Sequence, residues 1–406
     1  MNFATLQGLT IPEGVVTQIT DASGRVIWSA VKSVPVVLQV EKITSNTYAG
    51  ETTYNNEQFI LLDIYPKTNG TVKVTYGGLT KTITDTSGAE EPNAQQVFFG
   101  TFNGVSDSVT TPASGELTIE GGYKSFTCAT YASSSKSPTA SCPCITAVNE
   151  WGDLKYIADS AFNNCTSLAL TALPNSITSI GSSAFNGCTA LALTSLPNSL
   201  TSIGEYAFNG CTALALTSLP NSLTSIGNSA FSGCTSLALT SLPNSITSIG
   251  NSAFNNCTSL ALTALPNSIT SIGSSAFNRC IGINSVVIPN NCTVISGYAF
   301  YHCDNIKSVV IPDSVIEIGE NAFYLSSKTY EYSCSVGSGV TSIGSAALYN
   351  NDGTVTILAT TPPTAGSNVV GGQGAATRTT VIVPKGCSSA YKAADVWSSY
   401  NIVEAS

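Results

Sequence analysis

Leu191-Ala-Leu-Thr-Ser-Leu-Pro-Asn-Ser-Leu-Thr-Ser-Ile-Gly-Glu-Tyr-Ala-Phe-Asn-Gly-Cys-Thr-Ala213 is one unit of a repeat that returns every 23 residues between positions 157 and 350. Phenylalanine keeps this step in eight units, and cysteine and proline keep it in seven. One unit has too little apolar surface to fold alone, whereas stacked units bury one continuous core. The sequence therefore predicts a mainly β solenoid of about eight turns over residues 157–353.

The phenylalanines and cysteines are predicted to form ladders through the stacked turns. The ladder residues include Phe185, Phe208, Phe231, Cys188, Cys211, Cys234 and Cys257. Neighbouring strands lie roughly 4.7–4.9 Å apart, and parallel Cβ vectors at that spacing do not close a disulfide without strain. We expect buried, reduced thiols that act as small apolar groups.

The unit carries Leu-Pro-Asn-Ser-Ile-Thr-Ser-Ile-Gly at Leu173 to Gly181, followed by Ala-Phe-Asn-Gly-Cys at Ala184 to Cys188. In these residues it resembles the BspA-like leucine-rich repeats of bacterial surface proteins, some protozoan surface proteins and phage tail proteins. The resemblance covers about half of the chain and implies a leucine-rich-repeat solenoid. It implies no particular ligand, because a fold does not name what it binds.

Residues 1–30 are predicted to form a separate hairpin. Val15 to Thr20 and Arg25 to Trp28 are apolar runs, and Asp21 to Gly24 between them has turn chemistry. The stretch from Ile11 to Trp28 is similar to the opening segment of tail-associated proteins of gut phages and prophages, which implies a virion tail or baseplate partner at this end. The alternative is an ordinary N-terminal hairpin that packs on the next domain.

Three further regions flank the repeats. Residues 31–130 have strand periodicity with turns every 10–15 residues, which predicts an immunoglobulin-like β-sandwich. Residues 131–156 are predicted to be a linker and N-terminal cap, with Trp151 over the first turn. Residues 354–406 resemble the C-terminal cap of BspA-like proteins, where a short helix would seal the core with Tyr391 and Trp397.

Composition and charge exclude several classes of function. The net charge of −9 argues against a nucleic-acid partner, and no apolar run approaches the ~20 residues that span a membrane. Residues 1–14 lack a secretory signal, so we expect synthesis in a cytoplasm. His302 is the single histidine, and neither a catalytic triad, a metal site nor a cofactor motif is expected.

The first run of each unit leaves two arrangements open. In later units Ile283, Val286 and Ile288 alternate as the buried face of a strand. The same template would expose five leucines in the earlier units and bury five threonines, Thr171, Thr194, Thr217, Thr240 and Thr263. Since each exposed leucine forfeits roughly 1.5–3 kcal/mol, we favour a local bulge that turns the leucines in and the threonines out. The alternative is a stripe of exposed leucines that serves as a contact surface.

Three classes of function fit these features: a binding protein, a structural spacer of a tail or baseplate, and a depolymerase. We favour a non-enzymatic adhesin, a phage receptor-binding protein or a bacterial surface protein, that binds a host-cell glycan or protein; a homotrimer is possible. The middle units are nearly uniform and the later ones vary, which places the predicted site late in the solenoid. Its residues would be Tyr298, Tyr301, Tyr324, Tyr330 and Tyr332, beside the threonine column.

Overall fold

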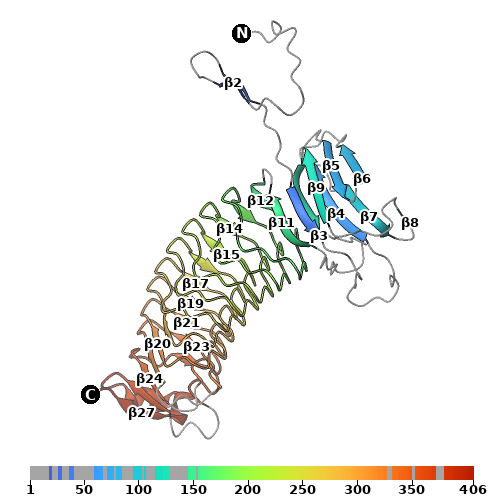
Figure 1. Ribbon diagram of the computed structural model, residues 1–406. Helices are drawn as coiled ribbons and strands as arrows, with labels where there is room; N and C mark the ends of the chain where they lie inside the picture. Colours follow the sequence, from blue (N-terminus) through green and yellow to red (C-terminus); the bar gives the residue numbers. More distant parts are fainter. Residues whose placement is uncertain are drawn as a thin grey trace, which may run out of the picture.

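The computed structural model shows an elongated, curved solenoid that follows a pair of N-terminal sheets (Figure 1). It describes residues 18–20, 26–29, 36–40, 59–66, 71–76, 79–84, 95–102, 105–106, 115–121, 123–128, 145–151, 154–326, 332–349, 353–371 and 379–406. Tyr330, the turn predicted at 21–24, and the linker stretch 131–144 lie outside the described residues.

The Ser-Ile pair of each repeat builds a parallel sheet that runs the length of the solenoid. Its ten strands are β12 (Tyr156–Ile157), β13 (Ser179–Ile180), β14 (Ser202–Ile203), β15 (Ser225–Ile226), β16 (Ser248–Ile249), β17 (Ser271–Ile272), β19 (Val294–Ile295), β21 (Glu317–Ile318), β23 (Ser342–Ile343) and β25 (Thr364–Ala365). Each strand is two residues long because the second residue points into the core and a glycine bend follows in most turns. The solenoid therefore has ten turns, and the expected number of about eight was too low.

A second parallel sheet exists only in the C-terminal turns. Its strands are β18 (Ser285–Val287), β20 (Ser308–Ile311), β22 (Ser333–Val336), β24 (Thr354–Ile357), β26 (Thr380–Val383) and β27 (Asn401–Glu404). The first run of the earlier units, predicted as a strand, has no strand geometry. There Leu193 is fully buried while Thr194 and Ser195 both face solvent, and two successive outward residues break the alternation that a strand requires.

The leucine and threonine columns take the arrangement that we favoured. Leu170, Leu193, Leu216, Leu239 and Leu262 are at most 6% exposed, whereas the five threonines that follow them are exposed. The alternative, an exposed leucine stripe, is wrong. Burial of the leucine column thus overrides the strand template that Val286 follows in the later turns.

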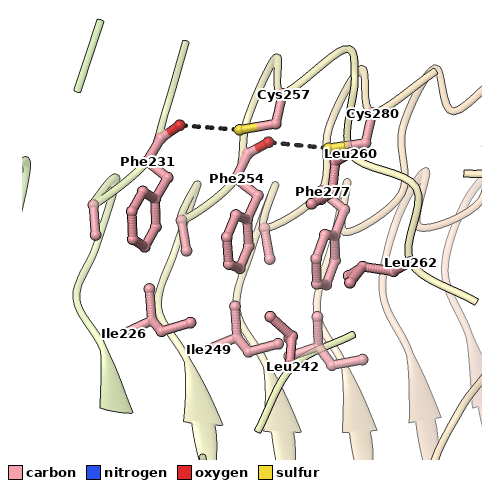
Figure 2. Packing of buried hydrophobic residues seen from close by; sticks show 14 of the residues in the cluster. Ile226, Phe231, Leu242, Ile249, Phe254, Cys257, Leu260, Leu262, Phe277 and Cys280 are labelled. Carbon is pink, nitrogen blue, oxygen red and sulfur yellow. Dashed lines mark hydrogen bonds between the residues drawn. The ribbon is translucent and has the colours of Figure 1, made fainter. Parts of the chain in front are cut away.

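The third side of each turn carries the phenylalanine ladder. The rings of Phe185 and Phe208 are parallel within 6°, with centroids 5.4 Å apart, and the stack continues through all eight ladder phenylalanines. Figure 2 shows the part of the stack formed by Phe231, Phe254 and Phe277. The backbone here joins each turn to the next, since the N–H groups of Ser183, Phe185 and Gly187 donate to carbonyls of the following turn at 2.7–2.8 Å. This side is a chain of tight turns, with Ser183 at a φ of 54°.

The ladder cysteines add a hydrogen bond of their own. Each thiol from Cys188 to Cys303 points at the phenylalanine carbonyl of the preceding turn, as for Cys257 and Phe231 at 3.0 Å (Figure 2). The seven ladder cysteines are fully buried and free of disulfides, as expected. Burial raises the pKa of Cys211, Cys234 and Cys280 well above the usual range, so these thiols stay protonated and unreactive.

The glycine after each Ser-Ile pair lets consecutive turns approach closely. A Cβ atom at Gly227 would lie 2.8 Å from the carbonyl carbon of Gly204, in the turn before it. The obstacle is main chain and cannot rotate away. Gly210 differs, because its φ is +72° and its nearest main-chain neighbour would be 3.8 Å from an added Cβ.

The N-terminal part contains a hairpin and two antiparallel sheets. The hairpin is β1 (Gln18–Thr20) with β2 (Val26–Ser29). One sheet has the order β10 (Tyr123–Cys128), β4 (Phe59–Pro66), β7 (Gln95–Phe102) and β8 (Val105–Ser106). The other has the order β11 (Ile145–Trp151), β3 (Val36–Val40), β9 (Gly115–Gly121), β5 (Thr71–Tyr76) and β6 (Leu79–Thr84). Two antiparallel sheets agree with the expected strands, and their immunoglobulin type stays a prediction.

Both ends of the solenoid core are covered. β11 pairs with β3 in the N-terminal sheet, and its Thr146 carbonyl also accepts the Ala169 N–H of the first turn at 2.9 Å. Trp151, on the same strand, meets Phe162 edge-on with centroids 6.0 Å apart. At the other end α1 (Ser388–Ala393) and the 3-10 helix η3 (Trp397–Ser399) bury Tyr391 and Trp397, as predicted.

We predict that Gly227→Ala lowers the free energy of unfolding by about 1–3 kcal/mol, because the added methyl group must push two turns apart. The matched control is Gly210→Asn, since asparagine occupies the same column at Asn164 and Asn256 with positive φ. It should cost less than about 1 kcal/mol. Urea unfolding followed by circular dichroism measures both. Equal losses in the two variants would show that the turns do not meet at the glycine.

We also predict that stability falls above about pH 8.5, the ordinary pKa of an unfolded cysteine. Burial raises the folded-state pKa of Cys292 to about 11 and of Cys334 to about 12. The unfolded chain therefore loses protons first, and each such thiol removes about 1.4 kcal/mol per pH unit. Urea unfolding at pH 8 and pH 10 measures the slope. Cys234→Ser, which keeps a donor and does not titrate there, should make the slope shallower; a stability unchanged between these pH values contradicts the prediction.

Candidate functional site

The residue that follows each ladder phenylalanine, or Leu348 in the turn after the last one, forms a column whose chemistry changes along the solenoid. In order it is Asn163, Asn186, Asn209, Ser232, Asn255, Asn278, Tyr301, Tyr324 and Tyr349. In the early turns the side chains satisfy one another, since the amide of Asn186 donates to Asn163 at 2.9 Å and that of Asn209 donates to Asn186 at 2.8 Å. The ladder ends at Asn278, whose buried Oδ1 has no hydrogen-bond partner among the described residues.

From Tyr301 onward the column is a stack of tyrosines, here called the tyrosine ridge (Tyr301, Tyr324 and Tyr349). The ring centroids of Tyr301 and Tyr324 are 5.2 Å apart with a tilt of 32°, and those of Tyr324 and Tyr349 are 4.6 Å apart and nearly parallel. All three side chains are half-buried. Burial raises the pKa of Tyr324, and neighbouring Tyr349, Tyr301 and Asp304 add to the effect, so its hydroxyl remains a donor.

Two further rings flank the ridge. Tyr298 meets Tyr301 at 64° with centroids 5.3 Å apart, and it is 37% exposed. Its φ of 60° is unusual for a bulky residue, at a position where most other turns carry serine. His302 lies 4.1 Å from Tyr301 and 5.6 Å from Tyr324, centroid to centroid. The tight turn therefore gathers four aromatic side chains from two neighbouring turns, and Tyr349 extends the group to a third.

Two carboxylates lie beside these rings. Asp304 accepts the backbone N–H and the hydroxyl of Ser326, both at 2.8 Å, and lies 3.6 Å from Nδ1 of His302. Glu320 accepts the Tyr298 hydroxyl at 3.4 Å and the Asn321 amide at 3.0 Å, both through Oε1. Both acids are thus oriented by neighbours and still lie at the surface.

Ser326, Asp304 and His302 do not have the arrangement of a catalytic triad. The serine hydroxyl donates to the aspartate, whereas a triad needs the imidazole to take the serine proton. Within the part of the chain that the structure describes, no group of three histidine, cysteine, aspartate or glutamate side chains is placed to hold a metal ion. The geometry suits hydrogen bonding and ring contact rather than covalent chemistry.

The structure brings together three of the five predicted tyrosines, Tyr298, Tyr301 and Tyr324. Tyr330 lies outside the described residues. Tyr332 was wrongly assigned to the contact surface, because its side chain is 3% exposed and packs in the core. A Cβ at Gly353 would meet its ring at 3.2 Å, so only glycine allows this packing. The threonine column is exposed on the earlier turns, and its part in binding stays a prediction.

Sequence reasoning missed four members of the site: Tyr349, His302, Asp304 and Glu320. Tyr349 had a usable signal, since the step from Ile318 to Ile343 is 25 residues and the same step leads from Tyr324 to Tyr349. His302 was weighed only as a catalytic base. For Asp304 no sequence pattern indicated the contact with Ser326, which lies 22 residues away in the next turn.

Comparison with known families matches residues 139–261 and 258–362 to the BspA type leucine rich repeat region. The matched residues make up more than half of the chain. The chain belongs to the BspA-type leucine-rich repeat family. A search of curated proteins finds no match.

Solved structures similar to this BspA-type chain come from several bacteria. A leucine-rich repeat protein from Bacteroides ovatus is 24% identical, with a TM-score of 0.46, over 63% of this chain and 69% of that one. A leucine rich cell surface protein from Faecalibacterium prausnitzii is 29% identical, with a TM-score of 0.33, over 46% and 58%. The pneumococcal vaccine antigen PcpA is 19% identical, with a TM-score of 0.38, over 62% and 71%. Among the described residues of the BspA-type chain, no helix has the length and apolar character needed to cross a membrane.

We predict that Tyr332→Phe changes the free energy of unfolding by less than about 1 kcal/mol, because its hydroxyl, next to the Cys334 thiol, reaches no oxygen or nitrogen partner. The matched variant is Tyr391→Phe, which removes a buried hydroxyl that donates to the Ala359 carbonyl at 2.8 Å. That change should cost about 1–3 kcal/mol. Urea unfolding measures both, and a comparable loss for Tyr332→Phe would contradict the unpartnered hydroxyl.

Proposed function

We propose that this BspA-type protein is a non-enzymatic recognition protein, an adhesin, that binds its target through the tyrosine ridge and the flanking side chains. One observation carries the proposal. The column of self-paired asparagines gives way to half-exposed tyrosines in the last turns, where the fold itself does not require them. The asparagine column shows that a polar residue can occupy the position and form a hydrogen bond with the equivalent residue of the neighbouring turn.

The ridge has the properties of a rigid contact surface. Tyrosine offers a large apolar ring and a hydroxyl, and it loses little conformational entropy on binding. Here each ring is already held by its neighbours at 4.6–5.2 Å, so much of the ordering cost is met before a ligand arrives. The turns before Arg279 are nearly uniform and almost uncharged, which suits a spacer that holds the ridge away from the N-terminal sheets.

The N-terminal segment suggests where the protein is attached. The stretch from Ile11 to Trp28, whose strands β1 and β2 form the hairpin, resembles tail-associated phage proteins, and this supports attachment to a virion tail or baseplate. In that setting the solenoid faces the host surface, and a homotrimer would present three ridges. The family also occurs in bacterial surface proteins, and a bacterial cell-surface adhesin is the alternative. A pure spacer, the second alternative, is supported by the uniform turns alone.

The proposal is tested by binding the full chain to an immobilised array of extracellular-matrix glycoproteins, mucins and bacterial surface polysaccharides. We expect retention on at least one target, and a loss of at least tenfold in affinity for Tyr301→Asn combined with Tyr324→Asn. The asparagines restore the residue type of the earlier turns, and the new amide at 301 can donate to the unpartnered Oδ1 of Asn278. The fold should therefore persist, as circular dichroism checks.

The matched control is Tyr206→Ala. Tyr206 is 46% exposed and occupies the same repeat position as Tyr298, but it makes no ring contact with any described residue. Its loss should leave binding unchanged. Retention on no target, or equal binding by the double variant and the intact chain, would support the spacer instead.

A further inference from the structure

We propose that the tyrosine ridge binds a linear, neutral polysaccharide whose chain runs along the solenoid axis, with about one sugar ring per turn. This assignment rests on the proposed function and names the class of ligand. Its components are three successive tyrosines, the open ring of Tyr298, and the carboxylates of Asp304 and Glu320.

The size of the ridge favours a short run of sugars over a folded protein. Its ring centroids advance by 5.2 and 4.6 Å, a step comparable with the advance of one hexose along an extended chain. A stable protein interface buries about 800 Å² on each partner. Three half-buried tyrosines expose on the order of 200–300 Å² together, since a whole aromatic side chain offers roughly 150–250 Å². Two or three sugar rings would cover such a surface.

The ring geometry provides both kinds of contact that a sugar makes. Tyr324 and Tyr349 are stacked nearly face to face, so the ring faces between them are covered and a ligand would meet ring edges there. Tyr298 stands at 64° to Tyr301 and is more exposed, and the two rings form an open corner. A hexose that places its C–H face in this corner would direct its hydroxyls toward the phenol oxygens of the next turns.

Glu320 has acceptor capacity left for sugar hydroxyls. A carboxylate offers about four lone-pair positions. Glu320 accepts the Tyr298 hydroxyl and the Asn321 amide through Oε1, and its Oε2 accepts no hydrogen bond from the described residues. Asp304 is oriented by the backbone N–H and the hydroxyl of Ser326 and holds its negative charge beside the ridge. A hydroxyl that donates to an ionised oxygen makes a bond roughly twice as strong as a neutral one. Both acids are also held in place, so little ordering is needed.

The local charge favours a neutral chain. Asp304 and Glu320 would repel the carboxylates or sulfates of an acidic polysaccharide. A strongly cationic polymer would meet Arg279, which is exposed and directly precedes His302 in its column. A neutral chain carries no charge for salt to screen, so affinity should depend only weakly on salt.

The test measures affinity of the full chain for soluble neutral glucans, mannans and galactans and for their oligosaccharides of one to six sugars, by isothermal titration calorimetry. For at least one series we expect affinity to rise about tenfold or more from one sugar to three and then to level off. Tyr349→Ala should remove the gain from the third sugar. Affinity that is independent of chain length, or no binding to any neutral series, would overturn the proposal.

A matched pair of variants tests the acid. Asp304→Asn should weaken binding about fivefold to tenfold. Asp313→Asn serves as the control, because Asp313 also accepts the backbone N–H and the hydroxyl of a serine in the next turn, Ser338, and it does not belong to the ridge. Equal effects of the two substitutions would mean that Asp304 acts on the fold and not on the ligand.

The same array separates this inference from the broader proposal. Periodate oxidation destroys sugars with neighbouring hydroxyls and leaves most of a polypeptide intact. If ridge-dependent binding disappears after oxidation of the retained target, the polysaccharide assignment stands. If ridge-dependent binding survives oxidation and is lost when the target is digested with protease, the protein is still an adhesin but its ligand is a polypeptide, and the inference is wrong.

Discussion

The main-chain hydrogen bonds between consecutive turns set the distance between equivalent residues along the solenoid. The N–H groups of Ser183, Phe185 and Gly187 reach the carbonyls of the following turn at 2.7–2.8 Å, and the Ser-Ile pairs do the same on another side of the turn. Such contact is possible only where no side chain intervenes, as at Gly227. Because the step is constant, any residue type kept at one repeat position forms a continuous row. Phenylalanine, cysteine, asparagine and tyrosine rows are all consequences of that one spacing.

The regular features of the fold could be predicted from the sequence, because they repeat. The stacked phenylalanines, the buried thiols and the seal formed by Tyr391 and Trp397 were expected and are present. The number of turns was underestimated because Leu348 and Val370 take the place of phenylalanine in the last two turns. A repeat count based on one residue type omits turns in which another residue type takes that position. The missing strand in the early turns has a similar origin, since Leu193 is buried where the later turns place Ser285.

The candidate site was predictable only in part, for a reason that lies in the same geometry. Tyrosines were expected late in the chain, but they form a contact surface only where they occupy the same repeat position in successive turns. Tyr324 and Tyr349 do, although a 25-residue step separates them, whereas Tyr332 is close to Tyr324 in sequence and belongs to the core. Contacts across turns, such as Asp304 with Ser326, follow from the three-dimensional register and not from local pattern.

Strand β11 belongs to two structures at once, and this has a mechanical consequence. One edge is bonded to β3 and the other to Ala169 of the first turn, so tension applied through the N-terminal sheets enters the solenoid at its end. Each turn contacts only its neighbours, and the bonds between turns are therefore loaded one set after another. A turn of 23 residues that peels away can extend to roughly 76–83 Å, at about 3.3–3.6 Å per residue. A molecule held at both ends would lengthen stepwise, as a spring that dissipates force before the attachment itself is strained.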